Sequence, residues 1–311
     1  MKMPFLLASL ALLWSSAAVA QPVPSPRPDE HAFRAIYKEM VETNTTRSTG
    51  SCTDLAAKVA KRLAAAGFAS TDIYEIEAPG HPQWGSIVAV LRGSDRKARP
   101  MLLLAHLDVV EANRADWVRE PFVLTEDKGV FYGRGTSDDK AQAAVWVDSL
   151  IRLRQSGFVP VRDIKMALTC GEETPDSFDG AEWLTLHARD LIDAEFALNE
   201  GAGGLLDAGG KRIALNIQAG QKVYQNFRAE ITNPGGHSSL PVHDNAIYNL
   251  AEGMLRLRDF DFPVQLSDGN RAYLTGMAKL LGGADGAAMA AVTADPANAA
   301  AAAVLARNPA W

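Results

Sequence analysis

The 311-residue sequence has little cysteine, no basic run and no internal repeat. Cys52 and Cys170 are too few for a disulfide scaffold, although they could pair in an exported protein. We expect two free, partly buried thiols. The net charge of -6 and the lack of a lysine- and arginine-rich segment argue against a nucleic-acid partner. The sequence also lacks a Gly-x-Ser-x-Gly elbow, which argues against a serine hydrolase using Ser238 or Ser239.

Long apolar runs are scarce as well, apart from one near the N-terminus. Lys2 precedes the apolar residues 5–14, and Ala18-Val19-Ala20 is a small-x-small cleavage site. This pattern predicts a signal peptide over residues 1–20, because the run is too short for a membrane span. A single membrane anchor is the alternative. We therefore expect a periplasmic or secreted protein without a stable membrane span, with a proline-rich extended leader over residues 22–28.

The remaining composition is that of a globular protein. Hydrophobic residues make up 47% of the chain and charged residues 22%, which allows a sizeable core. The expected strands are residues 86–92, 101–108, 163–169 and 194–199, and the expected helices are residues 51–68, 141–154 and 181–188. Their alternation predicts an α/β fold with a largely parallel sheet and flanking helices.

The pattern changes in the last third of the chain. Residues 223–232 alternate like a half-exposed strand, and a helix is expected over residues 245–258. The alanine-rich end of the chain predicts a further helix, with Asp295-Pro296 at its N-cap and first position. The expected domains after the signal peptide are an α/β domain over residues 21–219 and an α+β domain over residues 220–311.

The first chemical motif is His106-Leu-Asp108, at the end of an expected strand. The two side chains are two residues apart and therefore lie on one face. In open α/β sheets, ligands bind outside the carboxyl ends of the strands. A histidine there can bind a metal through one ring nitrogen while a carboxylate holds the other. Taken alone, the motif would indicate only a strand-end histidine beside a solvated aspartate.

Four more carboxylates follow later elements. Asp138 opens a helix after a glycine-rich turn, Glu172 and Glu173 follow the next strand, and Glu200 follows the one after it. Each by itself is typical of a capped helix or a solvated loop. Together with His106 they form a mixed set that suits zinc, cobalt or manganese. One carboxylate of such a set can bridge two ions.

The combined motifs resemble the M20 metallopeptidase family, which includes glutamate carboxypeptidase, aminoacylase, carnosinase-type dipeptidases and succinyl-diaminopimelate desuccinylase. The matching motifs are His106-Leu-Asp108, Trp117 with Pro121-Phe122, Gly133-Arg-Gly-x-x-Asp138-Asp-Lys140, Glu172-Glu173, Glu200 and Gly235-Gly-His237-Ser-Ser. The resemblance implies a zinc-peptidase-like catalytic domain with an inserted lid and dimerisation domain. It also implies two-metal hydrolysis of an amide bond by a carboxypeptidase, dipeptidase or N-acyl-amino-acid hydrolase.

The resemblance implies metal-binding roles residue by residue. His106 and Glu200 would bind one ion, Glu173 would bind the other, and Asp138 would bridge both. The two divalent ions would be zinc, with cobalt or manganese as alternatives. The peptide bond between Asp138 and Asp139 would be cis.

The resemblance also implies three catalytic roles. Glu172 would be the general base, and Asp108 would orient His106. His237 would reach the active site of a partner subunit in a homodimer and stabilise the oxyanion. The substrate would be a small peptide or an N-acyl amino acid.

One family feature is missing from the sequence, namely the returning segment that carries a second metal-binding histidine. The remaining candidates are poor substitutes: His31, His81, His187 and His243. We therefore expect a chain truncated at its C-terminus, with an incomplete lid, a loosely held second ion and little turnover. The alternative function is that of a catalytically impaired remnant that only binds metal or dimerises.

Overall fold

A computed structural model describes residues 28–308 except 175, 176, 202, 208, 221, 222, 224 and 238. The chain divides into two compact units between Glu200 and Gly201, earlier than the boundary expected near residue 220. The expected signal peptide and leader lie outside the described residues, apart from Pro28.

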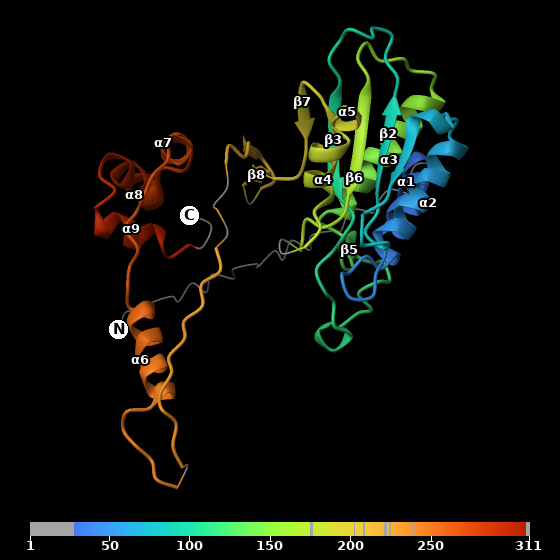
Figure 1. Ribbon diagram of the computed structural model, residues 1–311. Coiled ribbons are helices and arrows are strands. Elements are labelled where there is room, and N and C mark those ends of the chain that lie inside the picture. The colour runs from blue at the N-terminus through green and yellow to red at the C-terminus, as the bar shows by residue number, and fades with distance from the viewer. Residues whose placement is uncertain are drawn as a thin grey trace, which may run out of the picture. The chain divides into compact units, whose positions relative to one another are not determined.

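The first unit is built on a five-stranded sheet with the order β1-β2-β6-β3-β7 (Figure 1). The strands are β1 Ile73–Ile76, β2 Ser86–Leu91, β3 Met101–His106, β6 Ile164–Thr169 and β7 Phe196–Leu198. β3 runs parallel to β6 and β7, whereas β2 runs antiparallel to β1 and β6. The α/β class is confirmed, but the sheet is mixed rather than largely parallel. The segments that join β1 to β2 and β2 to β3 contain no α-helix, and parallel neighbours need a long crossover.

Helices cover both faces of this sheet (Figure 1). One layer holds α1 Pro28–Glu42, α2 Cys52–Ala65 and α3 Lys140–Gln155, and the other holds α4 Gly180–His187 and α5 Arg189–Ile192. Along β2, Ile87 and Ala89 pack in the cluster with α1 to α3, whereas Val88 packs with Leu184 of α4. This alternation explains why β2 is apolar at every position, since both of its faces are buried.

Short elements connect the layers of the first unit. They are the 3-10 helices η1 Ser70–Asp72 and η2 Arg114–Asp116, and the strands β4 Thr125–Asp127 and β5 Val130–Tyr132. β4 and β5 form a separate hairpin. The glycine-rich turn before Asp138 therefore follows this hairpin and not a strand of the main sheet.

The second unit contains one hairpin and four helices among its described residues. Its elements are β8 Gly204–Leu206, β9 Arg212–Leu215, α6 Ala246–Arg258, α7 Asp268–Leu281, α8 Gly283–Ala294 and α9 Ala299–Leu305. Met277, Met289 and Leu305 centre a small core of α7, α8 and α9.

Two sequence expectations for the second unit are corrected. The strand expected over residues 223–232 is wrong, because the described residues of that range form no strand. An alternating segment becomes a strand only where another strand pairs with it. The alanine-rich helix is confirmed, but Asp295 ends α8 and Asn298 caps α9.

Among the described residues, no helix has the length and apolar character needed to cross a membrane.

Candidate metal centre

The parallel strands bring the expected side chains to one edge of the sheet. β3 ends at His106, which pairs in register with Thr169 at the end of β6. Glu172 and Glu173 follow β6, and Glu200 follows β7. Carboxyl ends of parallel strands share an edge, so these residues meet although they are far apart in sequence.

The imidazole of His106 is the centre of this cluster. The residue is only 3% exposed. Its Nε2 lies 2.9 Å from Asp138 Oδ1, 3.8 Å from Glu200 Oε1 and 4.0 Å from Glu172 Oε2. Ligand atoms of His106, Asp138 and Glu200 lie within 4.8 Å of one another, as do those of His106, Glu172 and Glu173. The structure thus brings together the four residues that the sequence assigned as metal ligands and the one residue that it assigned as the general base.

These donors fit a divalent cation. Donor atoms around a tetrahedral zinc lie about 3.3 Å apart, given bonds of about 2.0 to 2.1 Å. The distances from Nε2 to the carboxylates span that value. Within the described chain, no lysine or arginine lies within 4.0 Å of the Asp138, Glu172, Glu173 or Glu200 carboxylates. Their negative charge is therefore available to a cation, and the mixed nitrogen and oxygen set suits zinc, cobalt or manganese.

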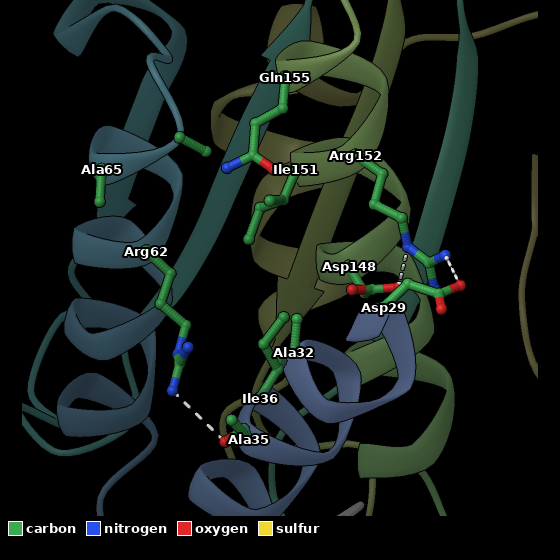
Figure 2. Close-up of a pocket in the computed structure, with 11 residues that line it drawn as sticks. Asp29, Ala32, Ala35, Ile36, Arg62, Ala65, Asp148, Ile151, Arg152 and Gln155 are labelled. Carbon is green, nitrogen blue, oxygen red and sulfur yellow. Dashed lines mark hydrogen bonds and ion pairs between the residues drawn. The ribbon is translucent and has the colours of Figure 1, made fainter. Parts of the chain in front are cut away.

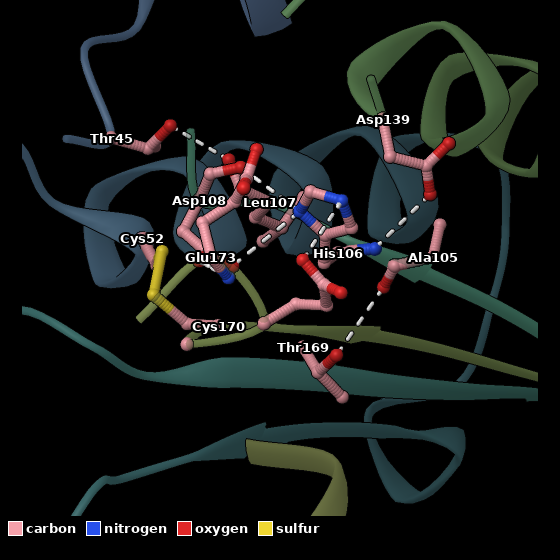
Figure 3. A network of polar contacts seen from close by, with 12 residues as sticks. Thr45, Cys52, Ala105, His106, Leu107, Asp108, Asp139, Thr169, Cys170 and Glu173 are labelled. Carbon is pink, nitrogen blue, oxygen red and sulfur yellow. Dashed lines mark hydrogen bonds and ion pairs between the residues drawn. A yellow bond between two sulfur atoms is a disulfide. The ribbon is translucent and has the colours of Figure 1, made fainter. Parts of the chain in front are cut away.

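Asp108 ties His106 to the loop that carries the two glutamates (Figure 3). The Asp108 carbonyl lies 3.0 Å from Nδ1 of His106, and its carboxylate lies 3.6 Å from the same nitrogen. The other carboxylate oxygen accepts a hydrogen bond of 3.0 Å from the backbone amide of Glu173. With Nδ1 directed at Asp108, Nε2 points to the carboxylates, which is the orientation that a metal ligand needs.

The local charges determine the protonation of His106. Burial is the largest single influence and lowers its pKa. The interaction with Asp108 and the negative charges of Glu200 and Asp139 outweigh burial and raise the pKa to about 10. In the absence of a cation the ring is therefore protonated at neutral pH.

The acids of the cluster respond to the same surroundings. Burial raises the pKa of Glu172, an effect opposed by His106 and reinforced by Glu200. Burial and the charge of Asp138 raise the pKa of Glu173. Burial by itself would raise the pKa of Asp108. His106 and the backbone amides of Glu173 and Gly171 outweigh burial, so the pKa is lowered.

Sequence reasoning missed the contribution of Asp139. This residue is 2% exposed, and its carboxylate accepts a hydrogen bond of 3.3 Å from the backbone amide of His106. Burial is the main reason that the pKa of Asp139 is raised to about 7. His106 lowers this pKa, but the charges of Glu200 and Asp138 raise it further. The Asp138–Asp139 peptide bond is cis, as the resemblance implied.

Lys140 is a second buried ionisable group beside the cluster. It is fully buried at the start of α3, and its Nζ donates a hydrogen bond of 2.7 Å to the Thr43 carbonyl. Burial lowers its pKa to about 7, although the charge of Asp108 acts in the opposite direction. The motif that contains Asp138 therefore also joins α3 to the chain after α1.

The expectation of two free thiols is wrong, because Cys52 and Cys170 form a disulfide. Cys52 begins α2 and Cys170 follows β6, and 118 positions separate them in the sequence. Their pairing depends on how α2 packs beside the sheet, which local patterns do not show.

His237 belongs to the second unit. Its ring Nδ1 lies 2.7 Å from the Ser239 hydroxyl, and the side chain is exposed. Its assignment to the oxyanion stays a prediction.

A groove of about 370 Å³ lies between α1, α2 and α3 (Figure 2). Ala32, Ile36 and Ile151 contribute apolar surface to it, and Arg152 pairs with Asp29 there at 3.1 Å. None of the residues around His106 lines this groove. It is therefore separate from the candidate metal centre.

The fold and the cluster define a class: an α/β unit with a candidate cation site of one histidine and several carboxylates near its strand ends. The model for peptidase family M20/M25/M40 matches residues 102–304, well over half of the chain. The chain belongs to this family.

Relatives of known type support the same assignment. The chain is 33% identical over 185 residues to the human N-fatty-acyl-amino acid synthase/hydrolase PM20D1, covering 58% of this chain and 36% of that protein. It is 34% identical over 156 residues to a probable succinyl-diaminopimelate desuccinylase of Staphylococcus aureus, covering 49% and 36%. The chain thus spans about a third of the length of the curated relatives it matches.

Two solved structures are also similar. Human carnosine dipeptidase 1 matches with 23% identity and a TM-score of 0.44, over 57% of this chain and 42% of that one. The M20 family metallo-carboxypeptidase Sso-CP2 from Sulfolobus solfataricus matches with 20% identity and a TM-score of 0.47, over 60% and 39%.

Proposed function

We propose that this chain hydrolyses an amide bond next to a small acyl or peptide group with the help of two divalent ions. The observation that carries the proposal is the convergence of Asp138, Glu172 and Glu200 on Nε2 of His106. The names of the relatives support the reaction type, since they describe an N-fatty-acyl-amino acid synthase/hydrolase and a probable succinyl-diaminopimelate desuccinylase. We propose a small peptide or an N-acyl amino acid as the substrate.

The proposed metal-binding roles are those that the family resemblance implies: one ion is assigned to His106 and Glu200, the other to Glu173, and Asp138 is shared. Ligand atoms of His106, Asp138 and Glu200 lie within 4.8 Å of one another, and those of Glu173 lie as close to His106 and Glu172, which supports these roles. We propose zinc, with cobalt or manganese as alternatives, because one imidazole among carboxylates suits these ions. When bound, such ions lower the pKa of water and polarise the amide carbonyl.

Glu172 is the proposed general base. Its carboxylate lies near the donor set but is 55% exposed, so it can reach both water and substrate. It takes a proton from the attacking water and delivers that proton to the nitrogen of the leaving amine. The raised pKa of Glu172 suits this role, because the group must hold the proton between the two transfers. Asp108 keeps the imidazole of His106 oriented.

Three further assignments complete the proposal. His237, supplied by the partner subunit of a homodimer, stabilises the oxyanion. The second unit acts as the lid and dimerisation domain. The protein is exported to the periplasm or secreted, and a disulfide between Cys52 and Cys170 is in keeping with an oxidising compartment.

The proposal is tested by incubating the purified 311-residue chain with N-acyl amino acids and dipeptides. Release of free amine is measured after metal removal and after addition of zinc or cobalt. We expect slow hydrolysis that requires metal, because the described residues offer the second ion only Asp138 and Glu173 as assigned ligands. Long incubations at high protein concentration are therefore needed. Metal binding without any amine release would favour the alternative, a remnant that binds metal or dimerises without turnover.

The affinity for zinc is expected to rise about tenfold per pH unit between pH 6 and pH 8. The free His106 ring has its pKa raised to about 10, so it is protonated throughout this range. A metal binds only the neutral ring, and the zinc ion assigned to His106 therefore displaces one proton. Competition with a chromophoric chelator gives the affinity, and calorimetry in buffers of different ionisation enthalpy counts the protons. His187→Gln, on the exposed face of α4, is the control and should leave the slope unchanged. A pH-independent affinity would contradict the assignment of His106.

A further inference from the structure

The disulfide between Cys52 and Cys170 connects the helical layer to the loop that carries two residues of the metal centre. Cys52 is the first residue of α2, and Cys170 directly follows β6. Both are buried, at 1% and 3% exposure. The glutamates Glu172 and Glu173 lie two and three positions after Cys170. The crosslink therefore acts at the base of the loop between Cys170 and Gly180, of which residues 171–174 and 177–179 are described.

Both ends of this loop are fixed at Cys170. The backbone amide of Gly180 donates a hydrogen bond of 2.8 Å to the Cys170 carbonyl, which closes the loop. Gly171 has a φ of 106°, and a Cβ there would lie 1.9 Å from the Phe178 carbonyl oxygen. The chain thus leaves and returns at the same place, and a shift of Cys170 would move both ends of the loop.

The disulfide also lies against the link between the loop and His106 (Figure 3). The sulfur atoms of Cys52 and Cys170 and a carboxylate oxygen of Asp108 lie within 4.8 Å of one another. Asp108 accepts the hydrogen bond from the Glu173 amide. The cavity beside these groups measures only about 10 Å³. That space holds no more than one water molecule, so this place is packed and is not a ligand pocket.

We propose that the Cys52–Cys170 disulfide is a positioning crosslink for the metal centre, holding Glu172 and Glu173 against the side of the site that His106 defines. The inference rests on the proposed two-metal function. His106 ends β3, Asp138 precedes α3, and Glu200 follows β7. The crosslink joins α2 to the end of β6 and is attached to none of these three elements. Breaking the disulfide therefore lowers the affinity for the ion assigned to Glu173 more than the affinity for the ion assigned to His106 and Glu200.

The bond can be broken by a dithiol reductant. A thiolate of the reductant attacks one cysteine sulfur and releases the other cysteine as a thiolate, which leaves a mixed disulfide. The second thiol of the reductant then attacks the reductant's own sulfur in this mixed disulfide and releases the first cysteine. The two cysteines gain two electrons and two protons, and the reductant becomes a cyclic disulfide. The double variant Cys52→Ala/Cys170→Ala gives the same uncoupled state without a reductant and should not respond to one.

The first measurement is hydrogen exchange in the metal-free 311-residue chain, before and after dithiothreitol. Thiol titration of the denatured protein establishes the starting state, and we expect no free thiol there. Reduction is expected to speed exchange about tenfold or more at residues 171–174, while β3 and β6 keep their protection. The double alanine variant should show the faster loop without reductant. Val59→Ala is the matched control, because it weakens the buried face of α2 and keeps the disulfide.

The second measurement is titration with Zn²⁺ or Co²⁺. Reduction is expected to lower the affinity for one ion by about tenfold, and this should be the same ion whose affinity Glu173→Gln lowers. The affinity for the other ion should change by less than about threefold.

Two free thiols in the untreated chain would overturn the proposal, as would uniformly faster exchange over the whole first unit or unchanged exchange in the loop. If the untreated chain binds no metal, the proposed function fails, and the exchange experiment by itself decides whether the crosslink positions the loop.

Discussion

Replacing Asp138 with alanine is expected to remove both metal ions from the protein. Its carboxylate lies 2.9 Å from Nε2 of His106 and is the group assigned to both ions. Each remaining half-site would keep fewer ligands, His106 with Glu200 on one side and Glu173 on the other. Loss of a shared ligand therefore lowers the affinity at both positions, and we expect a decrease of about a hundredfold or more.

Elemental analysis after dialysis against defined free zinc measures this effect. Asp116→Ala is the control, since Asp116 is an exposed aspartate of η2 and should leave the metal content unchanged. Circular dichroism shows whether the Asp138→Ala variant keeps its secondary structure. If a folded variant retains the metal content of the original chain, Asp138 is not the bridge.

Glu172→Gln is expected to abolish turnover while both ions stay bound. The substitution keeps the size of the side chain but removes its ability to take up a proton. General acid–base catalysis contributes roughly 10² to 10⁴ in rate, and a loss in this range is expected under conditions where the original chain has a measurable rate. Its metal content should not change, because the base is not assigned as a ligand.

The neighbouring substitution Glu173→Gln separates the two roles. Because Glu173 is assigned to the second ion, its amide variant should lose that ion and keep the ion of His106 and Glu200. Glu182→Gln, on the exposed surface of α4, is the control for the loss of one carboxylate. Equal loss of metal in the Glu172 and Glu173 variants would mean that the roles of base and ligand are wrongly divided.

The charge balance of the centre connects these predictions. Without a cation, Asp108, Glu200 and Asp139 raise the pKa of the buried His106 imidazole to about 10, although burial opposes this. Burial, reinforced by neighbouring carboxylates, raises the pKa of Glu172 and Glu173. Divalent ions would replace the proton on His106 as the compensating positive charge.

Much of the site was predictable because its signals are local. The strand over residues 101–108 and the helix over 141–154 follow from apolar runs and spacing, and the structure has β3 and α3 there. His106 stands at the end of such a run, and Glu200 follows another. Since the carboxyl ends of parallel strands meet at one edge, the sequence could predict their convergence before any distance was known.

The sequence by itself therefore determined the α/β class, most helices and strands of the first unit, and the residues that surround His106. The tertiary structure decided what depends on contacts between distant segments. It placed β6 between β2 and β3, antiparallel to β2 and parallel to β3, which makes the sheet mixed. It paired Cys52 with Cys170, and it turned Asp139 toward the backbone of His106. Periodicity and capping act over a few residues and can be read from sequence, whereas strand order and side-chain pairing depend on which packing of the whole unit has the lowest free energy.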